Sequence, residues 1–210
     1  MGLRLVAFDL DGTLLPGTTV SLILADRFDH RAEMDALEAR YARGEIGNDV
    51  VASESARHFA GVPLAALAAA LADAPFIAGI AATVAALRAA GIVPIVATVT
   101  LRPAARIVAE RFGFAAASGT EMGIREGCLT GVITRHFDGR DKAAFVRAEA
   151  AARGFALADC AAVGDSRSDL PTFAIVGRAI ALNATPDAVA AASLSLRTGD
   201  LRDVLPHLLR

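Results

Sequence analysis

Short apolar runs alternate with segments of helical periodicity over most of the chain. Within most of these runs the neighbouring residues are all apolar, which is typical of strands in a parallel sheet that helices cover on both faces. This alternation predicts an α/β fold built on a doubly wound parallel sheet. The predicted strands are Leu5–Phe8, Ile92–Ala97, Ala115–Ser118, Ala161–Val163, Ala179–Leu182 and Leu194–Leu196.

Helices and one hairpin account for the segments between these strands. The hairpin is predicted over Glu121–Thr134, because Arg125-Glu126-Gly127 separates two stretches of apolar–polar alternation. Pro94 is expected at the start of its strand or at a bulge, since proline has no N–H for a sheet hydrogen bond. One helix is predicted between Gly79 and Ala90 and one over about Arg102–Phe112. A third begins near Asp141, and the last lies within Asp200–Leu209.

A block of helical pattern from Pro16 to about Pro75 interrupts the strand–helix alternation. We predict that residues 16–75 form an inserted helical cap and that residues 1–15 and 76–210 form the core domain. This cap could be a lid beside a reaction site, which excludes water and shapes specificity. The alternative is a plain helical insertion that takes no part in the reaction. The helices expected in this block are Ser21–Phe28, Arg31–Arg43 and Asp49–Phe59.

The composition argues against several classes of protein. Of the 210 residues, 54% are hydrophobic, which is enough for a sizeable core. The 21 basic and 23 acidic residues are mixed along the chain, so no basic face for nucleic acid is expected. No apolar stretch is long enough to span a membrane, and Asp9 falls where a signal peptide would need its apolar core. We therefore expect a cytoplasmic protein that binds neither nucleic acid nor a membrane.

Two aspartates end the first apolar run. Asp9 and Asp11 are two positions apart, so their side chains point to the same side of a strand, and Gly12 then lets the backbone leave the sheet. Ligands bind at the carboxyl ends of parallel strands, and neighbouring carboxylates repel each other unless a cation lies between them. The pair therefore predicts a cation-dependent site, with two solvated aspartates that close a strand as the alternative.

A second acidic pair follows the run at Ala161–Val163. Asp165 comes directly after Gly164, and Asp169 follows four residues later, which puts both acids on one side if the residues between them form a helical turn. Carboxylates are the ligands that Mg²⁺ prefers in proteins, together with water and substrate phosphate. The sequence therefore predicts a Mg²⁺ site, and helix capping by Asp165 is the alternative interpretation.

Two further residues are candidates for binding a phosphate. Thr98 ends the second predicted strand shortly before a helix, so its hydroxyl and the free N–H groups of the helix start suit an anion. Lys142 lies in the first turn of a predicted helix, where a cation is unfavourable unless an anion is nearby. Each residue alone is more often structural, as a strand-ending threonine or a solvated lysine.

Together these motifs resemble those of the haloacid dehalogenase superfamily of phosphatases. The run Asp9-Leu10-Asp11-Gly12-Thr13 is similar to the first motif, and Thr98, Lys142 and the run from Gly164 to Asp169 follow in the order of the other three. The helical insertion after the first motif is similar to that of the phosphoserine phosphatase branch. The resemblance implies a Rossmann-like core with a C1-type helical cap, and Mg²⁺-dependent hydrolysis of a small phosphomonoester through an aspartyl-phosphate intermediate.

The resemblance also implies a role for each motif residue. Asp9 would attack phosphorus, and Asp11 would protonate the leaving group and then activate water. Thr98 and Lys142 would hold the oxygens of the transferring phosphate. The implied metal ligands are Asp9, the main-chain carbonyl of Asp11, and Asp165, with Asp169 as a further carboxylate on the metal side.

The chain departs from this branch where the organic part of the substrate binds. Phosphoserine phosphatases have a glutamate seven residues beyond the second aspartate and an arginine in the cap, whereas ungapped registration puts Thr18 and Ser55 there. A slip of one helical turn would instead bring Glu54 or Arg57 into the pocket. Without both charges phosphoserine would lose its charge-assisted hydrogen bonds, so a different small phosphorylated metabolite is expected.

Other activities are compatible with the same motifs. A phosphotransferase or mutase would use the same residues with an acceptor other than water, and phosphoserine phosphatase activity also remains open. A haloalkanoate dehalogenase needs neither Asp11 nor Mg²⁺, so the presence of Asp11, Asp165 and Asp169 argues against it. A non-catalytic binding protein would be expected to have lost one of the acids.

Overall fold

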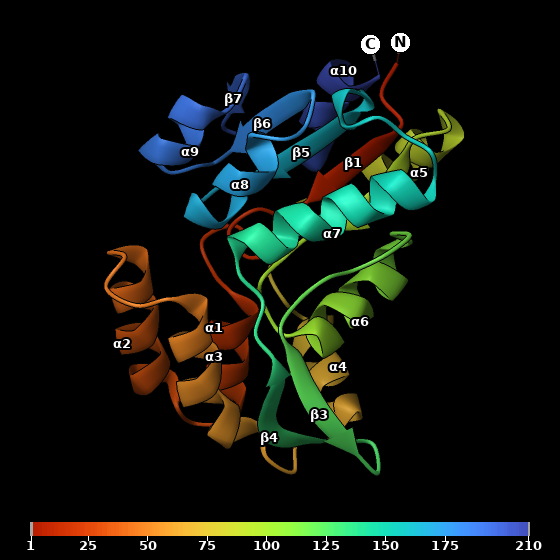
Figure 1. The fold of residues 1–210 in the computed structure, drawn as a ribbon. Helices are drawn as coiled ribbons and strands as arrows, with labels where there is room; N and C mark the ends of the chain where they lie inside the picture. The colour runs from red at the N-terminus through yellow and green to blue at the C-terminus, as the bar shows by residue number, and fades with distance from the viewer. Residues whose placement is uncertain (1, 210) are drawn as a thin grey trace.

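A parallel five-stranded sheet forms the centre of the upper half of the molecule in Figure 1. The computed structural model describes residues 2–209, and within them the strand order is β2-β1-β5-β6-β7. Helices connect these strands and cover both faces, so the predicted α/β fold with a doubly wound parallel sheet is confirmed. The strands are β1 (Leu5–Phe8), β2 (Val93–Val96), β5 (Cys160–Gly164), β6 (Arg178–Leu182) and β7 (Leu194–Leu196).

Alternate side chains of the sheet pack into two apolar layers. Val6 and Phe8 belong to one layer together with α5, α6 and α10, and Leu5 and Ala7 face α7 on the other side. Ala162 and Ala181 extend this second side under α8 and α9. Strands buried on both faces explain the uninterrupted apolar runs of the sequence. The helices are α5 (Ile80–Ala89), α6 (Arg102–Phe112), α7 (Gly139–Ala152), α8 (Leu170–Phe173), α9 (Pro186–Ala191) and α10 (Leu205–Leu208).

Pro94 is the second residue of β2, the strand at one end of the sheet. The amides of Val93 and Ala97 donate to carbonyls at β1, so the alternate position Pro94 turns its nitrogen to the outer edge. A proline is tolerated there because its missing N–H costs no hydrogen bond to β1.

The predicted strand over Ala115–Ser118 is wrong. This segment runs beside β2 but forms only one bridge, between Val96 and Ala117. Backbone hydrogen bonds join the segment to β2, with the amide of Ala115 donating to the carbonyl of Pro94 at 2.8 Å and that of Ser118 to the carbonyl of Val96 at 3.1 Å, but the pairing does not extend into a regular strand.

The helices of the inserted block and a hairpin lie in the lower half of the molecule in Figure 1. The hairpin lies within residues 76–210, the range predicted for the core domain. It nevertheless packs against the inserted helical block. The amide of Gly61 donates to the carbonyl of Leu129 and that of Leu64 to the carbonyl of Gly127. Among residues 2–209 no helix combines the length and apolar character needed to cross a membrane. The elements are α1 (Val20–Arg27), α2 (Arg31–Ala42), α3 (Asn48–Ala56), α4 (Leu64–Ala72), β3 (Glu121–Arg125) and β4 (Cys128–Arg135).

Candidate active site

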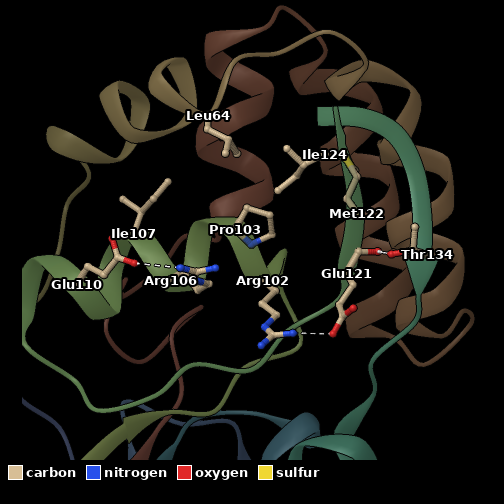
Figure 2. A pocket seen from close by; sticks show the side chains of 10 residues that line it. All are labelled: Leu64, Arg102, Pro103, Arg106, Ile107, Glu110, Glu121, Met122, Ile124 and Thr134. Carbon is tan, nitrogen blue, oxygen red and sulfur yellow. Dashed lines mark hydrogen bonds and ion pairs between the residues drawn. The ribbon is translucent and has the colours of Figure 1, made fainter. Parts of the chain in front are cut away.

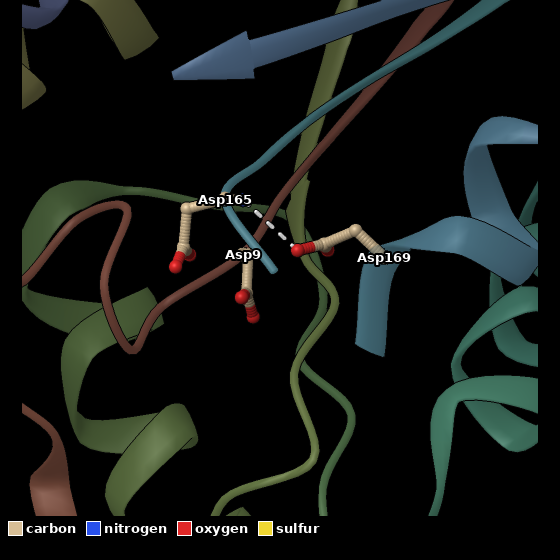
Figure 3. Close-up of side chains that lie close together, drawn as sticks. All are labelled: Asp9, Asp165 and Asp169. Atoms are coloured by element: carbon tan, nitrogen blue, oxygen red, sulfur yellow. Dashed lines mark hydrogen bonds between the residues drawn. The ribbon is translucent and has the colours of Figure 1, made fainter. Parts of the chain in front are cut away.

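The carboxyl ends of β1 and β5 bring three of the predicted acids together. Asp9 directly follows β1 and Asp165 directly follows β5, and these two strands are neighbours in the sheet. Asp169 lies in the short 3₁₀ turn Arg167–Asp169 that follows. One carboxylate oxygen of each residue lies within 4.8 Å of the others, and Figure 3 shows the three side chains around one point.

Lys142 is the cation of this cluster. It lies in the first turn of α7, and the helix is fixed by a capping box between Asp138 and Asp141. Its Nζ lies 2.8 Å from Oδ1 of Asp9 and also pairs with Oδ1 of Asp169. The residue is 1% exposed, so these carboxylates are what offsets the cost of burying its charge.

Asp169 has both carboxylate oxygens engaged. Oδ1 pairs with Lys142, and Oδ2 accepts hydrogen bonds from the amides of Asp165 at 3.0 Å and Ser166 at 3.1 Å. Asp169 therefore holds the loop after β5 against the lysine. Its implied place on the metal side stays a prediction.

Two glycines allow the acids to approach each other. Gly12 has a φ of +80°, and a Cβ built on it would lie 2.3 Å from Oδ2 of Asp165. A Cβ on Gly164 would lie 2.2 Å from Cγ of Asp169. Neither position has room for a larger residue while the carboxylates keep their places.

Thr13 orients Asp165. Its hydroxyl donates to Oδ1 of Asp165 at 2.8 Å, which links the loop after β1 to the loop after β5. Thr13 is part of the first motif, but its pairing with Asp165 could not be predicted because the two residues are far apart in the sequence.

Asp11 is bound to the first helix of the insertion. Its Oδ1 accepts from the amide of Val20 at 2.7 Å, and Val20 is the first residue of α1. Burial raises the pKa of Asp11 to about 8, with smaller contributions from the charges of Asp9 and Glu38. A carboxyl group with this pKa can hold a proton near neutral pH.

The charge balance of the cluster fits a bound cation. Burial raises the pKa of Asp9 to about 6 and that of Asp165 to about 8, and their negative neighbours add to the effect. Burial alone would lower the pKa of Lys142, but the carboxylates of Asp169 and Asp9 raise it above its ordinary value. Three carboxylates thus share one ammonium, and a divalent metal would supply the missing positive charge.

Thr98 lies two residues after β2, on the same cavity as Asp9, Asp11 and Asp165. It is fully buried, its amide donates to the hydroxyl of Ser118 at 3.0 Å, and its Oγ1 accepts from the amide of Thr100 at 3.3 Å. Thr98 also lines the cavity in front of Asp9. The structure therefore gathers all six predicted residues at one edge of the sheet.

A cavity of about 510 Å³ opens from this edge toward the helical half. Its lining includes Asp9, Asp11, Thr98 and Asp165 from the predicted set. The helical side and the loop after β5 add residues that the sequence reasoning missed, because no motif marks them. These residues are Glu38, Tyr41, Asn48 and Arg167.

Two of these residues tie the two halves of the molecule together. Asn48 begins α3, and its side-chain Nδ2 donates to the backbone carbonyl of Phe137 at 2.8 Å and to that of Val99 at 3.2 Å. Arg167 extends from the loop after β5 toward the helical half and donates to the carbonyl of Ile46 at 2.9 Å. Its Cζ lies over the ring of Tyr41, 4.0 Å from the ring centroid.

Thr18 and Ser55, which ungapped registration aligns with the glutamate and the cap arginine of phosphoserine phosphatases, lie in different surroundings. Thr18 lines the cavity, whereas Ser55 is buried in α3, where its hydroxyl donates to the carbonyl of Ala52. Glu54 and Arg57 are exposed and pair with each other at 3.0 Å. Neither of these two lines the cavity.

A second hollow, of about 400 Å³, lies between α6 and the hairpin (Figure 2). Its charged residues are matched with each other, since Arg102 pairs with Glu121 at 2.7 Å and Arg106 with Glu110 at 3.4 Å. None of the six predicted residues lines it, so the cavity at the sheet edge remains the candidate active site.

Sequence comparison connects the chain to known hydrolases. The family model described as haloacid dehalogenase-like hydrolase matches residues 6–174. A phosphoserine phosphatase of Halobacterium salinarum is 31% identical over 186 residues, which is 88% of each chain.

Solved structures share the fold. A phospho-aspartyl intermediate analogue of phosphoserine phosphatase superposes with a TM-score of 0.85 at 23% identity, over 99% of this chain and 100% of the other. A substrate-bound phosphoserine phosphatase complex gives a TM-score of 0.86 at 22% identity, over 99% of both chains.

Proposed function

The chain belongs to the haloacid dehalogenase-like hydrolase family, and on this premise we propose that it hydrolyses a small phosphomonoester through an aspartyl phosphate on Asp9. The observation that carries the proposal is the convergence of Asp9 and Asp165, which line one cavity, with Lys142, whose Nζ contacts Asp9. Hydrolysis of a phosphate ester needs a nucleophile, a fixed cation and a metal site within one small volume, and this edge of the sheet supplies the residues for each.

Asp9 is the nucleophile in this proposal. Its carboxylate attacks phosphorus, the bond from phosphorus to the ester oxygen breaks, and the phosphoryl group is transferred to Asp9. The Lys142 ammonium, 2.8 Å from Oδ1 of Asp9, lies where it can stabilise the negative charge of the phosphoryl oxygens. The Thr98 hydroxyl lines the same space and donates to another of these oxygens.

Asp11 is the acid and base of the proposal. With its pKa raised to about 8 by burial, it holds a proton that it gives to the departing alkoxide. The carboxylate left behind then takes a proton from the water that attacks the aspartyl phosphate. The hydrogen bond from the amide of Val20 keeps the Asp11 side chain aimed into the cavity through both steps.

Mg²⁺ fits the remaining carboxylates. Asp9, Asp165 and the main-chain carbonyl of Asp11 would hold it, and Asp169 would support the site through its bonds to Lys142 and to the loop after β5. When bound, the metal would offset the repulsion between Asp9 and the phosphate and polarise the phosphoryl oxygens.

The helical block is proposed to act as the cap of the site. We divide the chain into a core of residues 1–15 and 76–210 and a cap of residues 16–75. Support comes from the cavity, which has walls from both parts, and from Asn48 and Arg167, which join them. A cap in this place would keep bulk water from the aspartyl phosphate.

A panel of phosphomonoesters assayed with Mg²⁺ and then with chelator tests the proposed function. Phosphate release from at least one ester, lost with chelator and restored by Mg²⁺, is the expected result. Repeating the assay with candidate acceptor alcohols separates hydrolysis from phosphoryl transfer, since a phosphotransferase would form a new ester instead of inorganic phosphate. No Mg²⁺-dependent turnover of any ester would overturn the proposal.

A further inference from the structure

Glu38 brings a carboxylate into the cavity from α2, a helix in which the sequence shows no motif. Its Oε1 accepts a hydrogen bond from the hydroxyl of Thr19 at 3.0 Å. Thr19 directly precedes Val20, whose amide holds Asp11. Glu38 therefore lies on the wall that a substrate's organic part faces when its ester oxygen is next to Asp11.

This carboxylate has no cation of its own. Within residues 2–209 no arginine, lysine or histidine forms an ion pair with Glu38. Burial raises the pKa of Glu38, which shows that the surroundings do little to stabilise its charge. A positively charged ligand group would remove this cost.

The rest of the lining points to the same kind of ligand. Within residues 2–209 the lining holds five acidic residues and one basic residue, Arg167. The guanidinium of Arg167 is already bound to the carbonyl of Ile46 and stacked on Tyr41. Once a metal and Lys142 neutralise the phosphate end, the part of the cavity near Glu38 still favours a cation and disfavours a second anion.

We propose that Glu38 selects the substrate, and that the substrate class is the phosphate monoester of a small amino alcohol whose ammonium pairs with the Glu38 carboxylate. This inference rests on the proposed hydrolysis of a phosphomonoester. The short path from Asp11 through Val20 and Thr19 to Glu38 suits a nitrogen only a few bonds from the ester oxygen. A carboxylate on the same alcohol would find no free cation among the lining residues within 2–209.

A pair of substrates of equal shape tests the inference in the wild-type protein. O-phosphoethanolamine and n-propyl phosphate differ in a terminal ammonium against a terminal methyl group. We expect kcat/KM with Mg²⁺ to be about tenfold or more higher for O-phosphoethanolamine. Equal values for the two esters would overturn the inference while leaving the proposed hydrolysis intact.

The variant Glu38→Gln assigns the preference to one side chain. Glutamine keeps an oxygen that can accept from Thr19, so the helix packing is preserved while the charge is lost. The ratio of the two kcat/KM values is expected to fall to within about threefold of one. The matched control is Glu54→Gln, an exposed cap glutamate outside the cavity, which should leave the ratio unchanged.

The outcomes separate the two proposals. A preference for O-phosphoethanolamine that survives in Glu38→Gln would show that another group recognises the ammonium, and would overturn the assignment of Glu38. If the wild type hydrolyses neither ester, nor p-nitrophenyl phosphate, with Mg²⁺, the proposed function itself fails and the inference fails with it.

Discussion

The sheet wall and the helical wall of the candidate site hold their charged side chains in different ways. On the sheet side, Asp9, Lys142 and Asp169 are 3%, 1% and 2% exposed, and each charge has a partner of opposite sign. On the helical side, Glu38 is half-buried and has the hydroxyl of Thr19 as its partner. On the sheet wall, a change at Asp9, Lys142 or Asp169 leaves a buried charge unpaired, whereas the helical wall can exchange residues at little cost to its neighbours.

This difference separates the reaction from the choice of substrate. Asp9 and Asp165 directly follow the adjacent strands β1 and β5, whose register fixes their positions, and Lys142 reaches Asp9 from the first turn of α7. The groups proposed to meet the organic part of the substrate lie on helices that pack against the sheet half through side chains such as Asn48. Changes to the sheet wall should therefore abolish turnover, and changes to the helical wall should shift its selectivity.

The largest effect is expected from Asp9→Asn. The amide is nearly isosteric with the carboxylate, so the fold should persist while the nucleophilic charge is lost. We expect turnover of the best ester to fall by about a thousandfold or more, measured on protein whose circular dichroism matches the wild type. Retention of more than about a tenth of the wild-type rate would contradict the covalent mechanism.

The next effect concerns the metal. Asp165→Ala removes a carboxylate of the acid cluster, and we expect Mg²⁺ affinity measured by calorimetry to fall by about a hundredfold or more. Asp187→Ala is the control, because this exposed aspartate lines the same cavity but lies outside the acid cluster. Unchanged Mg²⁺ affinity in Asp165→Ala would show that the ligands are wrongly assigned.

The tie between the two walls predicts an intermediate effect. Asn48→Ala removes the donors to the carbonyls of Phe137 and Val99, each bond being worth about 1 kcal/mol. We expect the melting temperature to fall by about 2–4 °C per kcal/mol lost, and KM to rise more than kcat falls because the halves close less firmly. An unchanged KM with a lowered melting temperature would restrict Asn48 to a purely structural role.

A pH dependence of stability follows from the sheet wall alone. The pKa values of Asp11 and Asp165 are raised from 3.8 to about 8, so in metal-free protein these two groups bind more protons in the folded state than in the unfolded state between these two values. Stability must therefore fall as the pH rises through this window. Thermal melts without metal should show this fall, and saturating Mg²⁺ should flatten it. A melting temperature that rises with pH in metal-free protein would contradict the raised pKa values.

The smallest effect is expected for phosphoserine. Its ammonium can reach Glu38. Its carboxylate, however, enters a cavity in which Arg167 is the one basic lining residue within 2–209, and this arginine already donates to the carbonyl of Ile46. We expect kcat/KM for phosphoserine to be no better than for p-nitrophenyl phosphate. A value about a hundredfold higher, corresponding to about 2.7 kcal/mol, would show that the helical wall binds the carboxylate through another group.

The same contrast explains what the sequence could predict. The family, the parallel sheet and the phosphatase class were predicted and are confirmed, because each motif joins a strand end to its functional residue within a few positions. Glu38 escaped prediction because α2 carries charged residues on several of its faces, and the sequence does not say which face meets the cavity. The segment Ala115–Ser118 was predicted as a strand because local pattern does not reveal that its pairing with β2 stops at a single bridge.

Tyr41 gives the molecule a built-in optical reporter. The chain has one tyrosine and no tryptophan, so its intrinsic fluorescence originates almost entirely from the ring under the Arg167 guanidinium. A ligand that enters the cavity, or a movement that separates α2 from the loop after β5, changes the surroundings of this one fluorophore. Ligand binding and cap opening can therefore be followed in unlabelled wild-type protein, even with compounds that are never turned over.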